Sequence, residues 1–232
     1  MLTVVLPCHN EAENIARYGA ELFPSLDALG VAYEVVIVND GSTDDTAAAA
    51  QKLLITRKDT IILSVFPNRG MGGALRAGFD AAKGEWIATL DADLTFPPSY
   101  IKALYDAAIA SKADLVCGSP YLRPGDMDRV SWLRRLPSVM INSLYRGTFG
   151  GVITAYTPVF RLYRASFLKS LPLTSNGFEI NAEIAARAIL AKRRVVEVPA
   201  PLLARVSGAS KLRRGRELKR HAALIARLLA GK

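Results

Sequence analysis

The chain has 232 residues, half of them hydrophobic, and its 30 lysine and arginine residues outnumber its 21 aspartate and glutamate residues to give a formal net charge of +9. It contains no run of about 18 hydrophobic residues and no basic segment before an apolar stretch at its start, which argues against a membrane span and a signal peptide. Cys8 and Cys117 are too few for a disulfide framework. We therefore expect one domain, soluble or peripheral, in a reducing cytosol.

Hydrophobic, β-branched runs alternate with stretches of helical periodicity through the first half of the chain. This alternation is typical of βαβ crossovers and predicts an α/β fold with a mainly parallel sheet flanked by helices. The predicted strands are 2–6, 33–38, 60–65, 86–90 and 115–117, and the predicted helices between them are 11–29, 43–54, 71–82 and 98–111.

Beyond Gly118 the pattern is looser, and Pro120, Pro124 and Gly125 mark a loop. Pro137 lies inside the first helix predicted after this loop and is expected to kink it. The predicted elements are a helix over 130–148, a strand near 159–163, a helix near 178–192, and strands near 194–198 and 202–206.

The positive charge is concentrated at the C-terminus, where residues 192–232 carry twelve lysine and arginine residues against Glu197 and Glu217. Such a patch attracts nucleic acid, an anionic membrane surface or a phosphorylated ligand. No aromatic residues interleave these charges, so we expect no nucleic-acid binding. Residues 211–230 predict a basic amphipathic helix, whose hydrophobic stripe either packs on the domain or lies on an anionic bilayer, or does both. The stripe comprises Leu218, Ala222, Ile225, Leu228 and Leu229.

The most informative stretch is 85–93, a mostly hydrophobic run that ends in Asp91 and Asp93 with one small residue between them. In an open α/β sheet the carboxyl ends of the strands form the ligand crevice, and acids there are well placed to hold a divalent cation that meets a phosphate. The alternative is that both acids only cap the following turn, because aspartate readily bonds to its own backbone.

Three further predicted strands end in polar segments, at 6–11, 36–42 and 66–70. Together with Asp91-Ala-Asp93, in this order and spacing, they resemble the loops of family 2 glycosyltransferases of the GT-A fold. That family has a Pro-x-x-Asn-Glu first loop, an Asp-Gly-Ser second loop and an Asp-x-Asp metal motif. Within it, the chain is most similar to dolichol-phosphate mannose synthase and the bacterial polyprenyl-phosphate glycosyltransferases. The stretches that support this resemblance are 68–78, 90–98, 160–163, 177–183 and 205–212.

The resemblance covers nearly the whole chain and implies one GT-A domain over 1–232. Residues 1–118 would bind the nucleotide sugar, 119–210 the acceptor, and 211–232 would form the basic amphipathic helix. The glycines at 70, 72 and 73 follow the third predicted strand rather than the first, so they are not a dinucleotide fingerprint. We expect them to allow close backbone packing.

For the donor, the resemblance implies that one group of residues lines the nucleoside pocket and another faces the ribose and the diphosphate. The implied donor-site residues are Pro7, His9, Glu11, Val38, Asp40, Asn68, Asp91, Ala92, Asp93 and Lys211. The implied catalytic residues are Asp93, Asp91 and Arg205, and the implied ligands of Mg²⁺ or Mn²⁺ are Asp91, Asp93 and Thr95. His9 stands where the family often has tyrosine, and a structural hydrogen bond is its alternative role.

For the acceptor, the resemblance implies a phosphate site made by Arg129, Arg134, Ser138 and Arg205. The predicted helix over 130–148 mixes such phosphate-binding groups with hydrophobic residues, a combination that a lipid phosphate would satisfy. The alternative is that these are ordinary surface charges over a core helix.

Three positions depart from the family's pattern. Thr95 stands where glutamine is common, Pro120 replaces an arginine common in a Gly-Ser-Arg-Tyr loop, and Ala155 lacks a carboxylate that nothing visible in the sequence replaces. Arg123 is a candidate substitute for the missing arginine. We therefore expect the metal shell, the choice of sugar or the acceptor geometry to differ from those of the best-known relatives.

The resemblance implies inverting transfer of a hexose, mannose or glucose, from a GDP- or UDP-linked sugar to a polyprenyl or dolichyl monophosphate, by a protein that lies peripherally on the cytoplasmic face of a membrane. One alternative is a family 2 enzyme that uses a soluble or sugar-hydroxyl acceptor and a general base, for which Asp126 and Asp128 form the only close acidic pair between 119 and 190. Another is a catalytically silent sugar-nucleotide-binding module.

Overall fold

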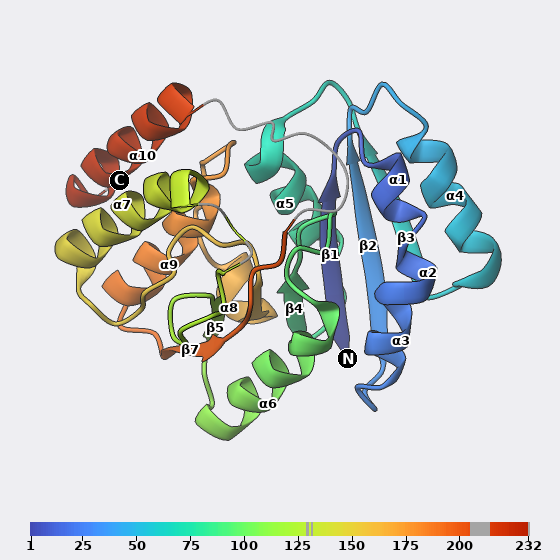
Figure 1. Cartoon of the computed structure of the whole chain (residues 1–232), viewed down its shortest axis with the longest axis horizontal. Helices are drawn as coiled ribbons and strands as arrows, with labels where there is room; N and C mark the ends of the chain where they lie inside the picture. The colour runs from blue at the N-terminus through green and yellow to red at the C-terminus, as the bar shows by residue number, and fades with distance from the viewer. Residues whose placement is uncertain (129, 131, 205–213, 232) are drawn as a thin grey trace.

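A computed structural model describes residues 1–128, 130, 132–204 and 214–231, and its centre is a seven-stranded sheet in the order β3-β2-β1-β4-β6-β5-β7 (Figure 1). Strands β1 to β4 are parallel, β6 is antiparallel to both of its neighbours, and β5 pairs in parallel with β7. The predicted mainly parallel α/β architecture is confirmed. The strands are β1 Leu2–Cys8, β2 Tyr33–Asp40, β3 Thr60–Val65, β4 Trp86–Thr89, β5 Leu115–Ser119, β6 Arg161–Arg164 and β7 Val195–Pro199.

Helices cover both faces of the sheet. The helices are α1 Ala12–Ile15, α2 Tyr18–Glu21, α3 Phe23–Asp27, α4 Thr46–Thr56, α5 Gly70–Ala81, η1 Pro98–Tyr100, α6 Ile101–Ser111, α7 Trp132–Phe149, α8 Ala165–Lys169, α9 Ile180–Leu190 and α10 Arg214–Leu229. One hydrophobic cluster contains side chains from α5, α7, α8, α9 and α10, and the other contains side chains from α1 to α4 and α6. Along β2 the alternation is direct, since Val36 and Val38 belong to the first cluster and Val35 and Ile37 to the second.

Two predictions about elements are wrong in part. The stretch 11–29 forms three short helices rather than one, and Pro24, which has no amide hydrogen, occupies the first turn of the third of them. Residues 202–204 form no strand, because the Leu202 and Leu203 amides donate to carbonyls of two loops, at Asp126 and Thr95. The remainder of the predicted strand 202–206 lies outside the described residues. Helix α8 was not predicted.

Helix α10 is confirmed over its described length and contacts α7 and α9, beside which it is drawn in Figure 1. Its inward side carries Glu217, His221, Leu224 and Leu228, all buried. His221 Nδ1 lies 3.0 Å from the Tyr145 hydroxyl of α7, and burial lowers the pKa of His221 to about 4. The imidazole is therefore neutral at physiological pH, and the underside of α10 is partly polar.

The predicted stripe on α10 is divided between the two sides of the helix. Leu228 is buried, whereas Leu218 and Leu229 are more than half exposed. Ala222 is also exposed. One part of the stripe thus packs on the domain, as the first alternative required, and another part faces outward.

Candidate active site at the carboxyl edge of the sheet

The polar loops after β1, β2, β3 and β4 meet at one edge of the sheet, because these four strands are parallel neighbours. The strands are also aligned in register: Val5 pairs with Val36 on one side and with Thr89 on the other. The predicted convergence of four strand ends is confirmed.

The loops after β1 and β2 are joined by reciprocal hydrogen bonds. The Asn10 amide donates to the Ser42 hydroxyl at 2.9 Å, and the Thr43 amide donates back to the Asn10 side-chain oxygen at 2.8 Å. The Glu11 amide donates to the Thr46 hydroxyl at 2.8 Å. Asn10 adopts φ of +53°, a left-handed conformation that asparagine tolerates well. The two loops therefore form one unit.

Asp40, at the end of β2, is the centre of a second group of contacts. Its carboxylate accepts the Arg69 amide at 2.7 Å, and its carbonyl accepts the Asn68 side-chain amide at 2.8 Å and lies 2.9 Å from His9 Nδ1. Asp40 is buried, and Val38 is fully buried in the core beneath it. The alternative role of His9, a structural hydrogen bond, is thus realised. Donor contacts by Pro7, His9, Glu11, Val38, Asp40 and Asn68 stay predictions.

The glycine-rich start of α5 lies against the chain at 175–176. The Gly72 amide donates to the Asn176 carbonyl at 2.9 Å, and a Cβ atom added at Gly72 would lie 2.2 Å from the Ser175 carbonyl oxygen. Gly70 has φ of +76°, and a Cβ there would lie 2.5 Å from the Asn176 carbonyl oxygen. The predicted role in close backbone packing is confirmed for Gly70 and Gly72, whereas a Cβ at Gly73 would meet the Arg69 side chain.

The side chain of Tyr18 supports the acidic loop after β4 through a hydrogen bond. The hydroxyl of this fully buried residue on α2 donates to the Ala92 carbonyl at 3.0 Å. One Asp93 carboxylate oxygen accepts the Thr95 amide at 3.1 Å, so the turn-capping role holds for Asp93. The Leu94 amide donates to the Asp91 carbonyl at 3.0 Å, and Leu94 has φ of +53°, a costly conformation for a leucine. The loop is thus fixed in a tight, strained turn.

The donor set of this loop fits a divalent cation held jointly with a nucleotide. Asp93 is 7 % exposed, and Asp91 lies at the same strand end with its side chain partly exposed. Within the described residues no group of three or more His, Cys, Asp or Glu side chains could hold a metal. Mg²⁺ is commonly bound by one or two carboxylates together with substrate phosphates and water, so two carboxylates at a ligand edge suffice. The predicted ligand role of Thr95 stays a prediction.

On the acceptor side, Ser138 lies in the first half of α7, and its hydroxyl is 2.8 Å from the Tyr121 hydroxyl and 2.9 Å from the Thr157 hydroxyl. Arg134 lies on α7 four residues before it. Arg129, Arg205 and Lys211 lie outside the described residues, and so does the side chain of Arg134. Their predicted contacts with phosphates stay predictions.

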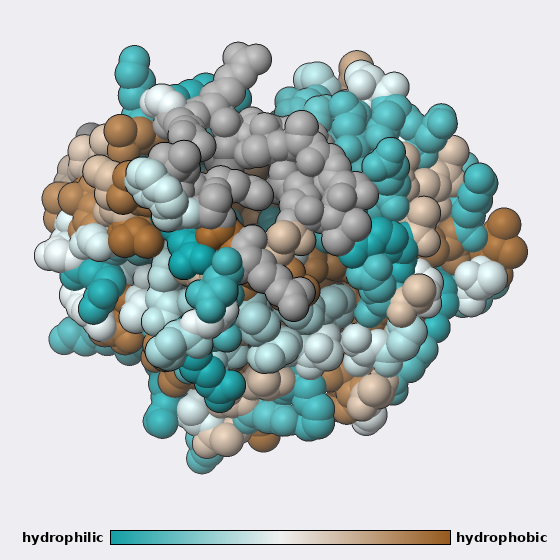
Figure 2. All heavy atoms as spheres, viewed as in Figure 1, coloured by the Kyte–Doolittle hydropathy of each residue, from teal (hydrophilic) through white to brown (hydrophobic). Residues whose placement is uncertain are grey.

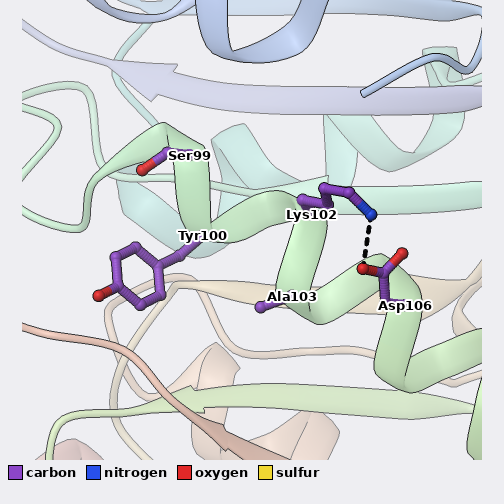
Figure 3. A pocket seen from close by; sticks show the side chains of 5 residues that line it. All are labelled: Ser99, Tyr100, Lys102, Ala103 and Asp106. Atoms are coloured by element: carbon purple, nitrogen blue, oxygen red, sulfur yellow. Dashed lines mark hydrogen bonds and ion pairs between the residues drawn. The ribbon is translucent and has the colours of Figure 1, made fainter. Parts of the chain in front are cut away.

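A hollow at the start of α6 is separate from this edge. Its lining residues are Ser99, Tyr100, Lys102, Ala103 and Asp106 (Figure 3). Lys102 and Asp106 form an exposed salt bridge of 2.6 Å along the helix. None of the predicted site residues lines this hollow, so we do not assign it to the active site.

Ala155 stands where the family pattern has a carboxylate, and in the structure a carboxylate from β7 contacts the loop at this position. Glu197 of β7 accepts the Thr154 amide at 2.7 Å and the Ala155 amide at 2.8 Å, and it also bonds to the Thr154 hydroxyl. Glu197 thus supplies a carboxylate to the backbone of this loop, while the predicted effect of Ala155 on the sugar or the acceptor stays a prediction. No local pattern indicates this contact, since 42 residues separate Glu197 from Ala155.

A family model described as glycosyl transferase family 2 matches residues 3–171. The chain belongs to this family. The predicted family resemblance is thus confirmed.

Two curated relatives of this chain act on lipid phosphates according to their names. An undecaprenyl-phosphate 4-deoxy-4-formamido-L-arabinose transferase of Edwardsiella ictaluri is 33 % identical over 222 residues, covering 90 % of this chain and 62 % of the relative. A dolichol-phosphate mannosyltransferase of Pyrococcus furiosus is 32 % identical over 217 residues, covering 91 % and 59 %. The chain therefore spans about three-fifths of the length of these relatives.

A solved structure of glucosyl-3-phosphoglycerate synthase from Mycobacterium tuberculosis, in complex with Mn²⁺, uridine diphosphate and glucosyl-3-phosphoglycerate, matches with a TM-score of 0.68 at 22 % identity. The match covers 99 % of this chain and 79 % of the synthase chain. At this level of identity the match establishes the fold, which is the predicted GT-A fold.

Proposed function

We propose that this glycosyltransferase transfers a hexose, such as mannose or glucose, from a GDP- or UDP-linked sugar to a polyprenyl or dolichyl monophosphate, with inversion at the anomeric carbon. One observation carries the proposal: an acidic loop and helix α7 lie at the same edge of the sheet. Helix α7 combines Ser138 with an exposed hydrophobic face. The lipid phosphates named for the curated relatives support it.

In the proposed reaction the acceptor's phosphate oxygen is the nucleophile. A phosphate monoester has its second pKa near about 6, so it is largely ionised at neutral pH and needs no strong general base. Its oxygen forms a bond to the anomeric carbon while the bond from that carbon to the donor's diphosphate breaks, and the diphosphate leaves with the electron pair. Attack from the face opposite the leaving group inverts the anomeric configuration.

The main barrier is the departure of the nucleoside diphosphate. Mg²⁺ or Mn²⁺ held by Asp91 and Asp93 supplies electrostatic stabilisation of the leaving diphosphate. The protein holds these two carboxylates in place before substrate arrives, through the Tyr18 contact beneath the loop and the turn at Leu94. Arg205 and Lys211 are proposed to add positive charge at the same diphosphate.

The membrane contact is proposed to involve α7 and α10. Figure 2 shows hydrophobic residues gathered on the side of the molecule that these helices occupy. On α7 the side chains of Trp132 and Met140 are 68 % and 63 % exposed. On α10 the exposed residues include Arg216 and Lys219 beside Leu218. A hydrophobic surface with a basic margin suits an anionic bilayer, and the proposed location is peripheral, at the cytoplasmic face.

Within the described ranges, no helix combines the length and the hydrophobicity needed to cross a bilayer. The proposed contact is accordingly one made by helices that lie along the surface.

The proposed activity is tested by incubating radiolabelled GDP-mannose, UDP-glucose and other nucleotide sugars with undecaprenyl or dolichyl phosphate and measuring label in the organic phase. We expect product with the lipid monophosphate, none with the uncharged polyprenol, and loss of product with EDTA. Transfer to a soluble sugar hydroxyl instead would identify a different acceptor class. Nucleotide-sugar binding without product across the whole panel would indicate a silent binding module.

The membrane contact gives a separate prediction. The double variant Trp132→Gln/Met140→Gln is expected to lower partition onto vesicles that contain anionic lipid by at least about tenfold, because burying each large side chain contributes about 1.5–3 kcal/mol. Vesicle flotation measures this, and Ile55→Gln on α4, where the side chain is 74 % exposed, is the matched control. Equal flotation of the double variant and the control would contradict the assignment of α7 to the membrane surface.

A further inference from the structure

Three hydroxyl groups from separate segments form a chain at the start of α7. Tyr121 follows β5, Ser138 lies on α7 and Thr157 precedes β6. The Ser138 hydroxyl oxygen is 2.8 Å from that of Tyr121 and 2.9 Å from that of Thr157. All three residues are partly exposed, so the chain of hydroxyls lies near the surface rather than in the core.

The protons of this cluster do not all find acceptors within it. The three hydroxyls have three protons, but only two hydrogen bonds join them, so one proton is not used within the cluster. The Asn142 side-chain amide also lies 3.5 Å from the Ser138 hydroxyl. A serine hydroxyl has one proton and two acceptor sites. In both contacts either oxygen can be the donor. If Tyr121 and Thr157 donate, at 2.8 Å and 2.9 Å, they fill both acceptor sites of Ser138. The Asn142 amide at 3.5 Å is too distant to compete, and the Ser138 proton points away from both hydroxyls. One strong donor is thus left for an external acceptor, and an oxyanion binds such donors best.

The protonation of Tyr121 supports this role. Burial raises the pKa of its phenol, an effect opposed by the hydrogen bonds to Ser138 and Asn142. The phenol therefore stays protonated and able to donate across the physiological pH range.

The cluster lies at the same sheet edge as the acidic loop. Strand β6 joins β4 to β5 in register, with Arg161 opposite both Thr89 and Cys117. Asp91 follows Thr89 by two residues, and Tyr121 follows Cys117 by four. Beyond the strands, the Phe96 ring stacks on the Phe160 ring with centroids 5.2 Å apart, which joins the segment after the acids to the segment that carries Thr157.

The loop that carries Thr157 is bonded from two sides. The Asn142 side-chain oxygen, buried on α7, accepts the amides of Tyr156 and Thr157 at 2.9 Å and 3.1 Å. The guanidinium of Arg161 donates to the carbonyls of Ala155 and Tyr156. The Thr157 hydroxyl is therefore held at Ser138 by the backbone, and binding a ligand there requires little ordering of the loop.

We propose that Tyr121 and Thr157 are positioning residues that orient the Ser138 proton toward the phosphate of the lipid acceptor. The inference rests on the proposed function and deepens it, because it assigns the acceptor phosphate to a hydroxyl cluster formed by three segments. The reacting phosphate then lies at the edge that carries Asp91 and Asp93, where the sugar donor is proposed to bind.

The test uses geranyl phosphate, a water-soluble isoprenoid monophosphate, as the probe. Titration calorimetry of Tyr121→Phe and Thr157→Val is expected to show affinity for it weakened about tenfold in each case. Without its neighbour's hydroxyl, the Ser138 proton is no longer held toward the phosphate, and one charge-assisted hydrogen bond is worth about that much. Affinity for UDP and GDP is expected to stay unchanged. In the transfer assay the same variants are expected to raise KM for undecaprenyl phosphate and leave KM for the donor unchanged.

Each substitution removes only a hydroxyl or replaces it with a methyl group, and Tyr105→Phe on α6 is the matched control. Unchanged geranyl phosphate affinity in both variants would overturn the inference while the proposed function stands. If the unmodified protein does not bind geranyl phosphate and transfers no sugar to lipid phosphate, the proposed function fails as well. An equal loss of nucleotide and geranyl phosphate binding would indicate a general structural role and also overturn the inference.

Discussion

Replacing Asp93 with asparagine is expected to lower the rate of sugar transfer by about 10²- to 10³-fold, the usual cost of removing one group that stabilises charge in a transition state. The substitution keeps the side-chain oxygen that accepts the Thr95 amide, so the turn is retained while the negative charge is lost. Initial rates at saturating Mg²⁺ or Mn²⁺, with the donor and lipid acceptor that give product, measure the effect.

The matched control is Asp106→Asn, which removes an exposed carboxylate paired with Lys102 on α6. It is expected to keep nearly full activity, because exposed ion pairs of this kind contribute little. Near-normal turnover of Asp93→Asn with metal present would contradict the proposed role of the acidic loop. Isothermal titration of Mn²⁺ in the presence of UDP or GDP gives an independent readout, since the variant is expected to bind the ion more weakly.

The second large effect concerns stability. Arg161 is fully buried at the start of β6 and donates to the carbonyls of Ala155, Tyr156, Pro158 and Asn181. Replacing it with methionine keeps most of the side-chain volume but removes these bonds. We expect the free energy of unfolding to fall by about 4 kcal/mol or more, because four carbonyls lose this donor and each buried acceptor left without a partner costs about 1–3 kcal/mol. Chemical denaturation with circular dichroism measures the change.

Arg164→Met on the same strand is the control. Its guanidinium lies 4.5 Å from the Trp86 ring centroid and pairs with Glu85 at 3.3 Å, and its side chain is partly exposed. Such surface contacts contribute about 1 kcal/mol or less. If the two variants were equally stable, the carbonyl contacts of Arg161 would not support the loop at 155–158.

Local patterns were sufficient to predict the sheet and its polar edge. Hydrophobic runs such as 2–6 and 33–38 are read directly from the sequence, and in a parallel sheet their ends meet at one edge whatever the details of the helices. The acids at 91 and 93 were recognisable for the same reason, since both follow a buried strand without interruption.

The contacts that support the edge were not predictable, because they join distant residues. Tyr18 reads as a hydrophobic helix position, yet its hydroxyl holds the carbonyl of Ala92, 74 residues away. Arg161 reads as a charged residue in a short strand, and only the folded loop shows why it is buried. The strand expected near 202–206 does not form over its described part, 202–204, because the amides of Leu202 and Leu203 bond to two loops. Patterns in one segment carry no information about such partners.

The partly polar underside of α10 limits where the chain can be shortened. The helix covers Tyr145, and Arg227 lies 3.9 Å from the fully buried carboxylate of Glu183 on α9. Truncation at residue 204 would expose Tyr145 and Glu183 to water, together with the hydrophobic side chains that form one cluster with Leu224. Fragments intended for crystallisation or calorimetry should therefore retain the last helix, even when the interest lies only in residues 1–118.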